Sequence, residues 1–255
     1  MTQAMRMKYL MITLLLSLAM PAISQEVGYL VDEGERLEKG MKDAEALEKY
    51  REALKIAPSD LRARVRCSEI LSTIGYRDTD PARRKRAFEE ARDLAGEALK
   101  TDSLSADANY VMALALSRLT EAATIKEKLQ LVGEIHRYAE MATRIHPDHK
   151  KALYTLGKWH MEVASLGMAQ KAAIKLAVKD LPEASLEQAV VLFERVRTLA
   201  PGFIANLLAL AETYKAAGRS DKAIPILERL VKLPPVSQDD PAYKEKARKL
   251  LNALY

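Results

Sequence analysis

The sequence has 255 residues, of which 49% are hydrophobic, 5% are aromatic and 29% are charged, and its formal net charge is +5. This composition is too apolar for a disordered chain, and the excess of basic residues is too small to indicate a nucleic-acid partner. Because Cys67 is the only cysteine, an internal disulfide is excluded and the fold must be stabilised by packing.

The first predicted element is a secretory signal peptide over residues 1–24. Arg6 and Lys8 precede an apolar run that ends near Met20, and Ala22-Ile23-Ser24 has the small residues of a cleavage site. The run is about twelve residues long, shorter than the roughly twenty that span a membrane. We therefore expect a periplasmic or secreted protein with no transmembrane segment after cleavage. An uncleaved N-terminal anchor is the alternative.

Residues 25–255 are predicted to form a single domain built from repeated helix pairs. Apolar residues recur at spacings of three and four, and each second helix keeps twelve residues between its first small or branched anchor and the residue that ends the unit. The five instances are Ala46–Pro58, Ala91–Ser103, Ile135–Pro147, Ala189–Pro201 and Ala223–Pro235. This pattern is typical of the tetratricopeptide repeat, a helix pair of about 34 residues.

The predicted repeats and the final helix follow one another without a large gap. They cover residues 27–60, 61–105, 107–149, 150–203 and 204–236, with a capping helix at 239–255. Asp80-Pro81 and Asp239-Asp240-Pro241 are typical helix starts, because aspartate caps a helix and proline fits its first turn. In the fourth repeat Gly157 would allow a close helix approach. The predicted fold is an all-α, right-handed α-solenoid of about five tetratricopeptide-like helix pairs with a C-terminal capping helix.

The fourth repeat also resembles one particular family. Leu156-Gly157-Lys158-Trp159, an insert ending at Pro182, and Ala200-Pro201-Gly202-Phe203 are similar to the C-terminal half of the regulator of microtubule dynamics family. The resemblance extends from about Ala106 to the C-terminus and implies a tetratricopeptide-like fold, with this chain as a secreted bacterial-type relative. Reported lipid binding by the repeat domain of eukaryotic members implies a lipid-binding alternative. A signal peptide would keep this chain from cytosolic microtubules, so that role is not carried over.

Residue patterns for catalysis or metal binding are weak. The metal-ligand types His146, Asp148 and His149 lie at the turn that ends the third repeat, which favours a polar turn. His136 and His160 lie in predicted helices without acidic or cysteine partners at ligand spacing, and packing or surface roles are expected for them. We predict no enzyme activity, no cofactor and no metal.

A basic run at residues 83–86 is followed by two glutamates and lacks interleaved aromatic residues, so it indicates a solvated helix face and no nucleic-acid partner. The insert over residues 167–184 places three lysines, Lys171, Lys175 and Lys179, on one helical face, while Leu176 and Leu181 are expected to pack elsewhere. Either the insert is an extra packed helix with a solvated lysine face, or it forms a basic lid over the groove.

The inner face of such a solenoid is formed by the first helix of each pair, and we predict that it binds a peptide or a partner protein. The groove candidates are Val65, Glu69, Val111, Arg118, Tyr154, Lys158, Met161, Leu208, Glu212 and Lys215. The expected function is that of a non-catalytic binding or scaffold protein of the cell envelope. The alternative is a lipid- or amphiphile-binding module in which the 167–184 insert acts as a lid.

Overall fold

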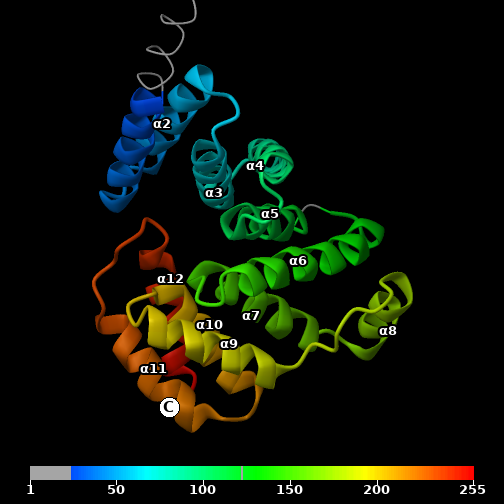
Figure 1. Ribbon diagram of the computed structural model, residues 1–255. Coiled ribbons are helices and arrows are strands. Elements are labelled where there is room, and N and C mark those ends of the chain that lie inside the picture. Colours follow the sequence, from blue (N-terminus) through cyan, green and yellow to red (C-terminus); the bar gives the residue numbers. More distant parts are fainter. Residues whose placement is uncertain (1–23, 122) are drawn as a thin grey trace, which may run out of the picture.

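A computed structural model describes residues 24–121 and 123–255, and these ranges contain helices and connecting segments but no strand (Figure 1). All of the predicted signal peptide except Ser24 lies outside the described residues. Residues 24–39 form the first helix. It is followed by α2 (Asp43–Ile56), α3 (Leu61–Arg77), α4 (Pro81–Thr101), α5 (Ala106–Leu119), α6 (Ile125–Ile145), α7 (Lys150–Ala164), α8 (Met168–Ala177), α9 (Leu186–Leu199), α10 (Ile204–Ala216), α11 (Ser220–Lys232) and α12 (Asp240–Asn252).

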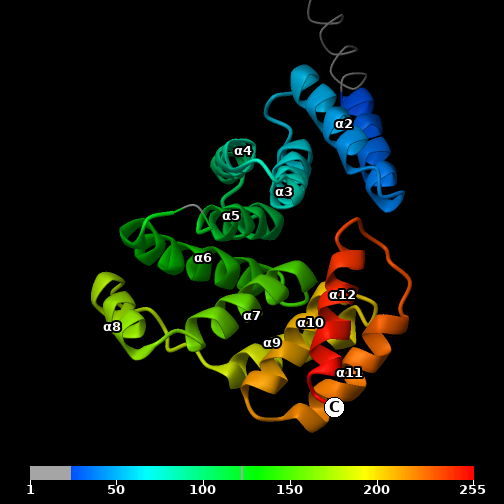
Figure 2. The ribbon, with the colours of Figure 1, turned by 180° about the vertical axis from the view of Figure 1, so that it is seen from behind.

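The helices pack as consecutive pairs that wind into a curved solenoid (Figures 1 and 2). The partners are α3 with α4, α5 with α6, α7 with α9, and α10 with α11, while α12 covers the last pair by contacting both of its helices. Helix α8 lies between the two helices of the fourth pair in sequence and contacts α6 in space. The predicted fold class, an all-α solenoid of tetratricopeptide-like pairs with a C-terminal cap, is confirmed.

Three of the pairs are held by a glycine that faces a buried aromatic ring. These contacts are Gly34 with Tyr50, Gly75 with Phe88, and Gly157 with Phe193. A Cβ atom added to Gly157 would lie 2.6 Å from Cε1 of Phe193, and one added to Gly75 would lie 2.8 Å from Cε1 of Phe88. All three rings are at most 1% exposed and have no space to withdraw into. The close approach predicted at Gly157 is therefore present, and it depends on the absence of a side chain.

Side-chain caps fix where the helices begin. Asp80 accepts hydrogen bonds from the backbone N–H groups of Ala82 and Arg83, and α4 begins at Pro81 as predicted. Thr124 and Glu127 form a reciprocal capping box at α6. Helix α12 carries proline in its first turn, again as predicted. These caps set the lengths of the connections and hence the register of each pair.

The insert is held mainly by one apolar side chain and the segment after it. Ile174 is the buried residue of α8, and Val178 packs so closely on Gly133 of α6 that a Cβ atom there would lie 2.7 Å away. Met168 and Leu176 are 90% and 89% exposed. The expectation that Leu176 packs is wrong, because it lies two residues beyond Ile174 and so points away from α6.

The two ends of the solenoid meet. Arg77, the last residue of α3, lies 2.5 Å from the Asp43 carboxylate at the start of α2 and 3.2 Å from the Asp239 carboxylate, just before α12. The side-chain amide of Gln238 also donates to the backbone oxygen of Met41. Figures 1 and 2 both show the α11–α12 connection beside the start of α2. This ring closure turns the concave face of the solenoid into an enclosed space.

Candidate functional site: the central cavity

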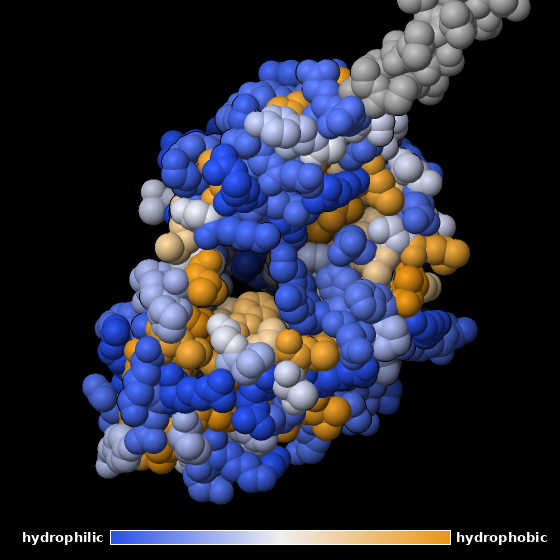
Figure 3. Space-filling view, turned by 60° about the vertical axis from the view of Figure 1, so that its left-hand side comes forward, coloured by the Kyte–Doolittle hydropathy of each residue, from blue (hydrophilic) through white to orange (hydrophobic). Residues whose placement is uncertain are grey.

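The enclosed space is a cavity of about 1150 Å³. The inner helices α3, α5, α7 and α10 line it, together with parts of α6, α8 and the beginning of α12. Figure 3 shows an opening that leads into the interior, with hydrophobic residues gathered on one side of it. Helices from different repeats thus contribute to one site, which has the size of a small-molecule or peptide-segment pocket.

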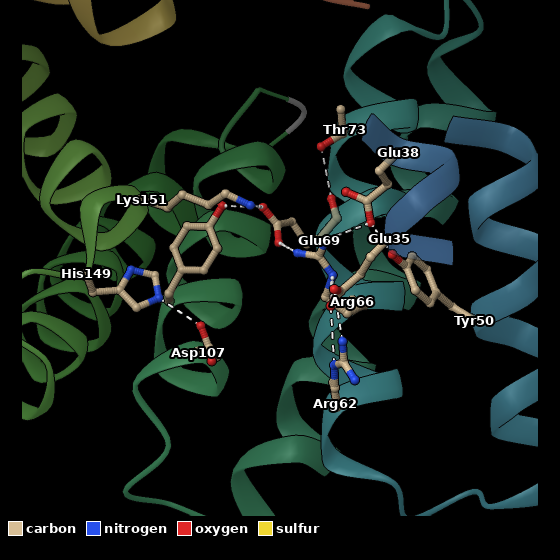
Figure 4. A network of polar contacts seen from close by, with 11 residues as sticks. Glu35, Glu38, Tyr50, Arg62, Arg66, Glu69, Thr73, Asp107, His149 and Lys151 are labelled. Atoms are coloured by element: carbon tan, nitrogen blue, oxygen red, sulfur yellow. Dashed lines mark hydrogen bonds and ion pairs between the residues drawn. The ribbon is translucent and has the colours of Figure 1, made fainter. Parts of the chain in front are cut away.

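One wall of the cavity is a polar network between the first helix, α3, α5 and α7 (Figure 4). Arg66 lies 3.1 Å from the carboxylates of both Glu38 and Glu69. Glu69 also pairs with Lys151 and accepts a hydrogen bond of 3.1 Å from the Tyr110 hydroxyl. Burial alone would raise the pKa of Glu69, but the charges of Lys151 and Arg66 together with these hydrogen bonds hold it below its usual value. The charges of this wall compensate one another.

A second part of the cavity lining, here called the aromatic wall, is aromatic and apolar. Tyr154 of α7 packs against Phe203 at a ring-centroid distance of 5.1 Å, and Tyr243 of α12 lines the same space. The guanidinium carbon of Arg118, on α5, lies 4.0 Å from the centroid of the Tyr76 ring. Such stacking stabilises a cation without neutralising its charge. This wall therefore offers apolar surface beside a positive charge.

Six of the ten predicted groove residues line the cavity. The structure brings together Glu69, Arg118, Tyr154, Lys158, Leu208 and Glu212. Their role in binding stays a prediction, but their convergence on one surface agrees with the expected inner face.

The other four predicted groove residues do not line the cavity. Val65 and Val111 are 6% and 0% exposed and belong to the core between the helices, one position away from the cavity residues Arg66 and Tyr110. Met161 packs against the core of the last repeats, and Lys215 lies on the exposed end of α10. An error of one residue rotates a position around the helix by about 100°. This error explains why Val65, Val111 and Met161 point away from the cavity, but it does not explain Lys215.

The insert lysines also lie away from the cavity. Lys171, Lys175 and Lys179 are exposed, whereas α8 lines the cavity through Gln170, Ala173 and Ile174. The apolar side of α8 thus faces the interior, and its lysines form the solvated face of the insert.

The histidines at the end of the third repeat are engaged in a turn. Both ring nitrogens of His149 have partners, since Nε2 lies 2.9 Å from Asp107 and Nδ1 accepts from the backbone N–H of Ala152. Asp148 pairs with Arg195. Within residues 24–121 and 123–255, no group of three or more histidine, cysteine or acidic side chains is arranged to hold a metal ion.

Two further histidines pack around the single tryptophan. The rings of His136 and His160 lie 4.5 and 4.9 Å from that of Trp159, whose indole N–H donates to the backbone oxygen of Val132. Burial lowers the pKa of His136, and burial together with the neighbouring His136 lowers that of His160 to about 4. Both rings are therefore neutral at pH 7 and act as packing residues.

Comparison with known proteins identifies the family. Residues 30–255 match the family model described as Regulator of microtubule dynamics protein 1-3. The chain belongs to this family. The resemblance seen in the fourth repeat is thus confirmed, and it extends over nearly the whole described chain.

Members of the regulator of microtubule dynamics family share about a quarter of their residues with this chain. Regulator of microtubule dynamics protein 3 of Xenopus laevis is 27% identical over 163 residues, which cover 63% of this chain and 35% of that protein. Regulator of microtubule dynamics protein 1 of Caenorhabditis elegans is 24% identical over 185 residues, which cover 72% and 80%. The chain therefore spans about a third of the Xenopus protein and most of the Caenorhabditis protein.

A solved structure supports the fold. TTC0263, a thermophilic tetratricopeptide-repeat protein of Thermus thermophilus, superposes with a TM-score of 0.64 at 16% identity, over 88% of this chain and 99% of that chain. At this identity the likeness extends to the solenoid alone. In the described ranges no helix combines the length and the apolar character that a membrane span needs.

Several cavity residues were not predicted from the sequence. They are Arg66, Tyr76, Lys151 and Tyr243. A signal for two of them was present, because Arg66, Glu69, Thr73 and Tyr76 follow one helical face at spacings of three and four. Tyr243 reaches the cavity through the ring closure, which no local pattern encodes.

Proposed function

We propose that the protein is a non-catalytic binding protein of the cell envelope that holds a peptide segment of a partner protein in its central cavity. The observation that carries the proposal is an enclosed cavity of about 1150 Å³ that successive repeats line together. A peptide presents apolar side chains and backbone N–H and C=O groups along one extended chain, which suits a cavity with one aromatic and one polar wall.

The test is retention of soluble peptides by the purified protein. A random decapeptide mixture is passed over immobilised protein, and the retained peptides are identified by mass spectrometry. Ala173→Trp adds bulk where α8 faces the cavity, whereas Ala172→Trp adds the same bulk on the exposed side of α8. We expect Ala173→Trp to retain at least tenfold less peptide and Ala172→Trp to behave as the wild type. Equal retention by all three proteins would refute binding in the cavity.

The envelope location rests on the predicted signal peptide. The intact mass of protein exported from a bacterial host reports whether residues 1–24 are removed. Loss of these residues supports the proposal, and a mature chain that still begins at Met1 contradicts cleavage and favours the anchored alternative.

A second candidate ligand is a lipid or another amphiphile, and the observation that favours it is the position of α8. This insert places Ala173 and Ile174 at the cavity, where it could cover a hydrocarbon chain. Native mass spectrometry and organic extraction of the purified protein separate the two candidates. Co-purifying lipid that is lost in Ala173→Trp but kept in Ala172→Trp supports the amphiphile, whereas its absence together with peptide retention supports the first proposal.

A further inference from the structure

Arg118 is a cation that lacks an anionic partner among the described residues. It lies near the end of α5, its Nε atom is buried, and that N–H has no hydrogen-bond acceptor in the described ranges. None of the ion pairs between described residues includes its guanidinium group, which rests on the face of the Tyr76 ring. A guanidinium group can donate five hydrogen bonds, and a buried N–H without an acceptor, here that of Nε, destabilises the fold. Packing alone gives no reason to keep a charge at this position.

The hydroxyls of two further tyrosines that line the same cavity as Arg118 are also available as donors. Tyr110, on the polar wall, and Tyr214 each donate a hydrogen bond to a glutamate, but the hydroxyls of Tyr154 and Tyr243 have no such partner among the described residues. Burial raises the pKa of both of these phenols, and the positive charge of Arg118 acts on both in the opposite direction. Both phenols are therefore protonated at neutral pH and lie within electrostatic range of Arg118.

The charges of the cavity indicate which kind of bound group could pair with Arg118. The carboxylates of Glu38, Glu69 and Asp239 each lie beside an arginine or a lysine. The carboxylates of the polar wall and of the ring closure are therefore already paired with cations other than Arg118. A bound carboxylate could accept from its guanidinium group and from the tyrosine hydroxyls, which are strong donors in a low-dielectric site.

Glu212 gives the site a second charge. It lines the cavity from α10 and forms no ion pair with a described residue. A hydrocarbon chain with one carboxylate would satisfy Arg118 and leave Glu212 beside apolar atoms. A peptide satisfies both, because its backbone N–H groups or a basic side chain can donate to Glu212.

We propose that Arg118, with the hydroxyls of Tyr154 and Tyr243, forms a carboxylate subsite in the central cavity that binds an acidic group of the bound peptide. This inference rests on the proposed peptide-binding function and specifies the chemistry of the partner. The carboxylate comes from the C-terminus of the peptide or from an aspartate or glutamate side chain. Glu212 then orients the peptide by accepting from N–H groups next to that carboxylate.

The first test uses decapeptides retained by the wild-type protein, synthesised with a free or an amidated C-terminus and with their acidic residues kept or replaced by the amides. Trp159 is the only tryptophan and lines the cavity, so its fluorescence reports binding. We expect at least a tenfold loss of affinity when the recognised carboxylate becomes an amide, since a charge-assisted hydrogen bond is lost. Which of the two changes weakens binding identifies the source of the carboxylate.

Two arginine variants show whether Arg118 is the group that recognises it. Arg118→Gln should bind acid and amide peptides equally. Arg137→Gln is the matched control, because Arg137 also stacks on a tyrosine, at 4.2 Å from the Tyr138 ring, but lies outside the cavity. This control should keep the tenfold preference of the wild type. An acid preference that survives in Arg118→Gln, or the absence of any preference in the wild type, overturns the subsite.

Two small probes separate failure of the subsite from failure of the peptide function. 4-Phenylbutyrate and 4-phenylbutyramide differ only in the carboxylate, and dodecanoate adds a long hydrocarbon chain. If no peptide is retained but phenylbutyrate binds better than its amide in an Arg118-dependent way, the subsite stands and the peptide function fails. If dodecanoate binds at least tenfold more tightly than every peptide, the occupant is an amphiphile. If peptides bind without regard to charge, the peptide function stands and the subsite is refuted.

A stability measurement distinguishes this binding role from a structural one. Arg118→Gln removes the stacking on Tyr76 but no ion pair between described residues, so its unfolding midpoint should fall no further than that of the stacking control Arg137→Gln. A midpoint clearly below that of Arg137→Gln would show that Arg118 stabilises the fold by more than this stacking and would contradict the proposal.

Discussion

The contact between Gly157 and Phe193 allows a sharp test of the packing. In Gly157→Ala the added Cβ atom would lie 2.6, 2.8 and 3.0 Å from three atoms of the Phe193 ring, all at or below the closest approach that such atoms tolerate. The ring is 0% exposed and packs against Tyr154 at a centroid distance of 5.9 Å, so it cannot turn away freely. Overpacking of this kind costs about 1–3 kcal/mol, and alanine recovers up to about 1 kcal/mol through its helix propensity.

The expected net effect of Gly157→Ala is a loss of about 1–2 kcal/mol, and Gly157→Leu should lose about 2–4 kcal/mol, measured by urea unfolding. Gly28→Ala is the control, because Gly28 lies in the first helix with nothing within 4 Å of the added atom. It should stabilise by about 0.5–1 kcal/mol. Adding Phe193→Leu to Gly157→Ala should restore part of the loss. If Gly157→Ala stabilises as much as Gly28→Ala, the close contact does not exist.

Three further predictions concern His160, the ring closure and the insert. The pKa of His160 in the fold, about 4, is below its ordinary value of 6.5. Between these two pH values the unfolded chain binds more protons than the folded chain, so the free energy of unfolding falls as the pH drops. Wild type should therefore lose about 2 kcal/mol more than His160→Gln between pH 7 and pH 5 in urea unfolding, and parallel losses would contradict this. Arg77→Gln should cost about 1–2 kcal/mol and speed hydrogen exchange in the first turn of α12. The exposed control Arg83→Gln should change stability by less than about 0.5 kcal/mol, and equal exchange in both variants would argue against the closure. Replacing Lys171, Lys175 and Lys179 together by glutamine should also change stability by less than about 0.5 kcal/mol and leave peptide affinity unchanged, whereas weaker binding of acidic peptides would indicate a basic lid.

The helix pairs could be predicted because each carries its own local signals. These signals are aspartate caps, prolines in first turns and a fixed anchor spacing, and each involves only residues close in sequence. Gly157 is a further local signal, because a glycine within a helix indicates that a neighbouring helix packs closely there. The exposure of Leu176 was not predictable in the same way. Helical period alone cannot tell which apolar stripe of a short insert faces the protein, and that choice is made here by the contact between Val178 and Gly133.

The cavity could be predicted only in part. The inner face follows from the repeat, but its register has to be correct to one residue, which is why the predicted residues Glu69 and Arg118 line the cavity and Val65 and Val111 do not. Contributions from distant segments depend on how far the solenoid curves. That curvature is a sum of small rotations between neighbouring pairs, so the approach of Asp239 to Arg77 has no local sequence signal.

The ring closure changes how this solenoid should come apart. An open repeat array behaves as a linear chain of neighbours, and its terminal units detach first and independently. Here the contacts of Arg77 and Gln238 join the two termini of that chain, so neither end is free to peel away alone. Separating α12 and the connection before it from the first helices therefore requires these contacts to break, which couples the two ends of the solenoid. It also means that an occupant too large for the opening seen in Figure 3 enters or leaves only when this junction opens, so its residence time can be set far from the groups that hold it.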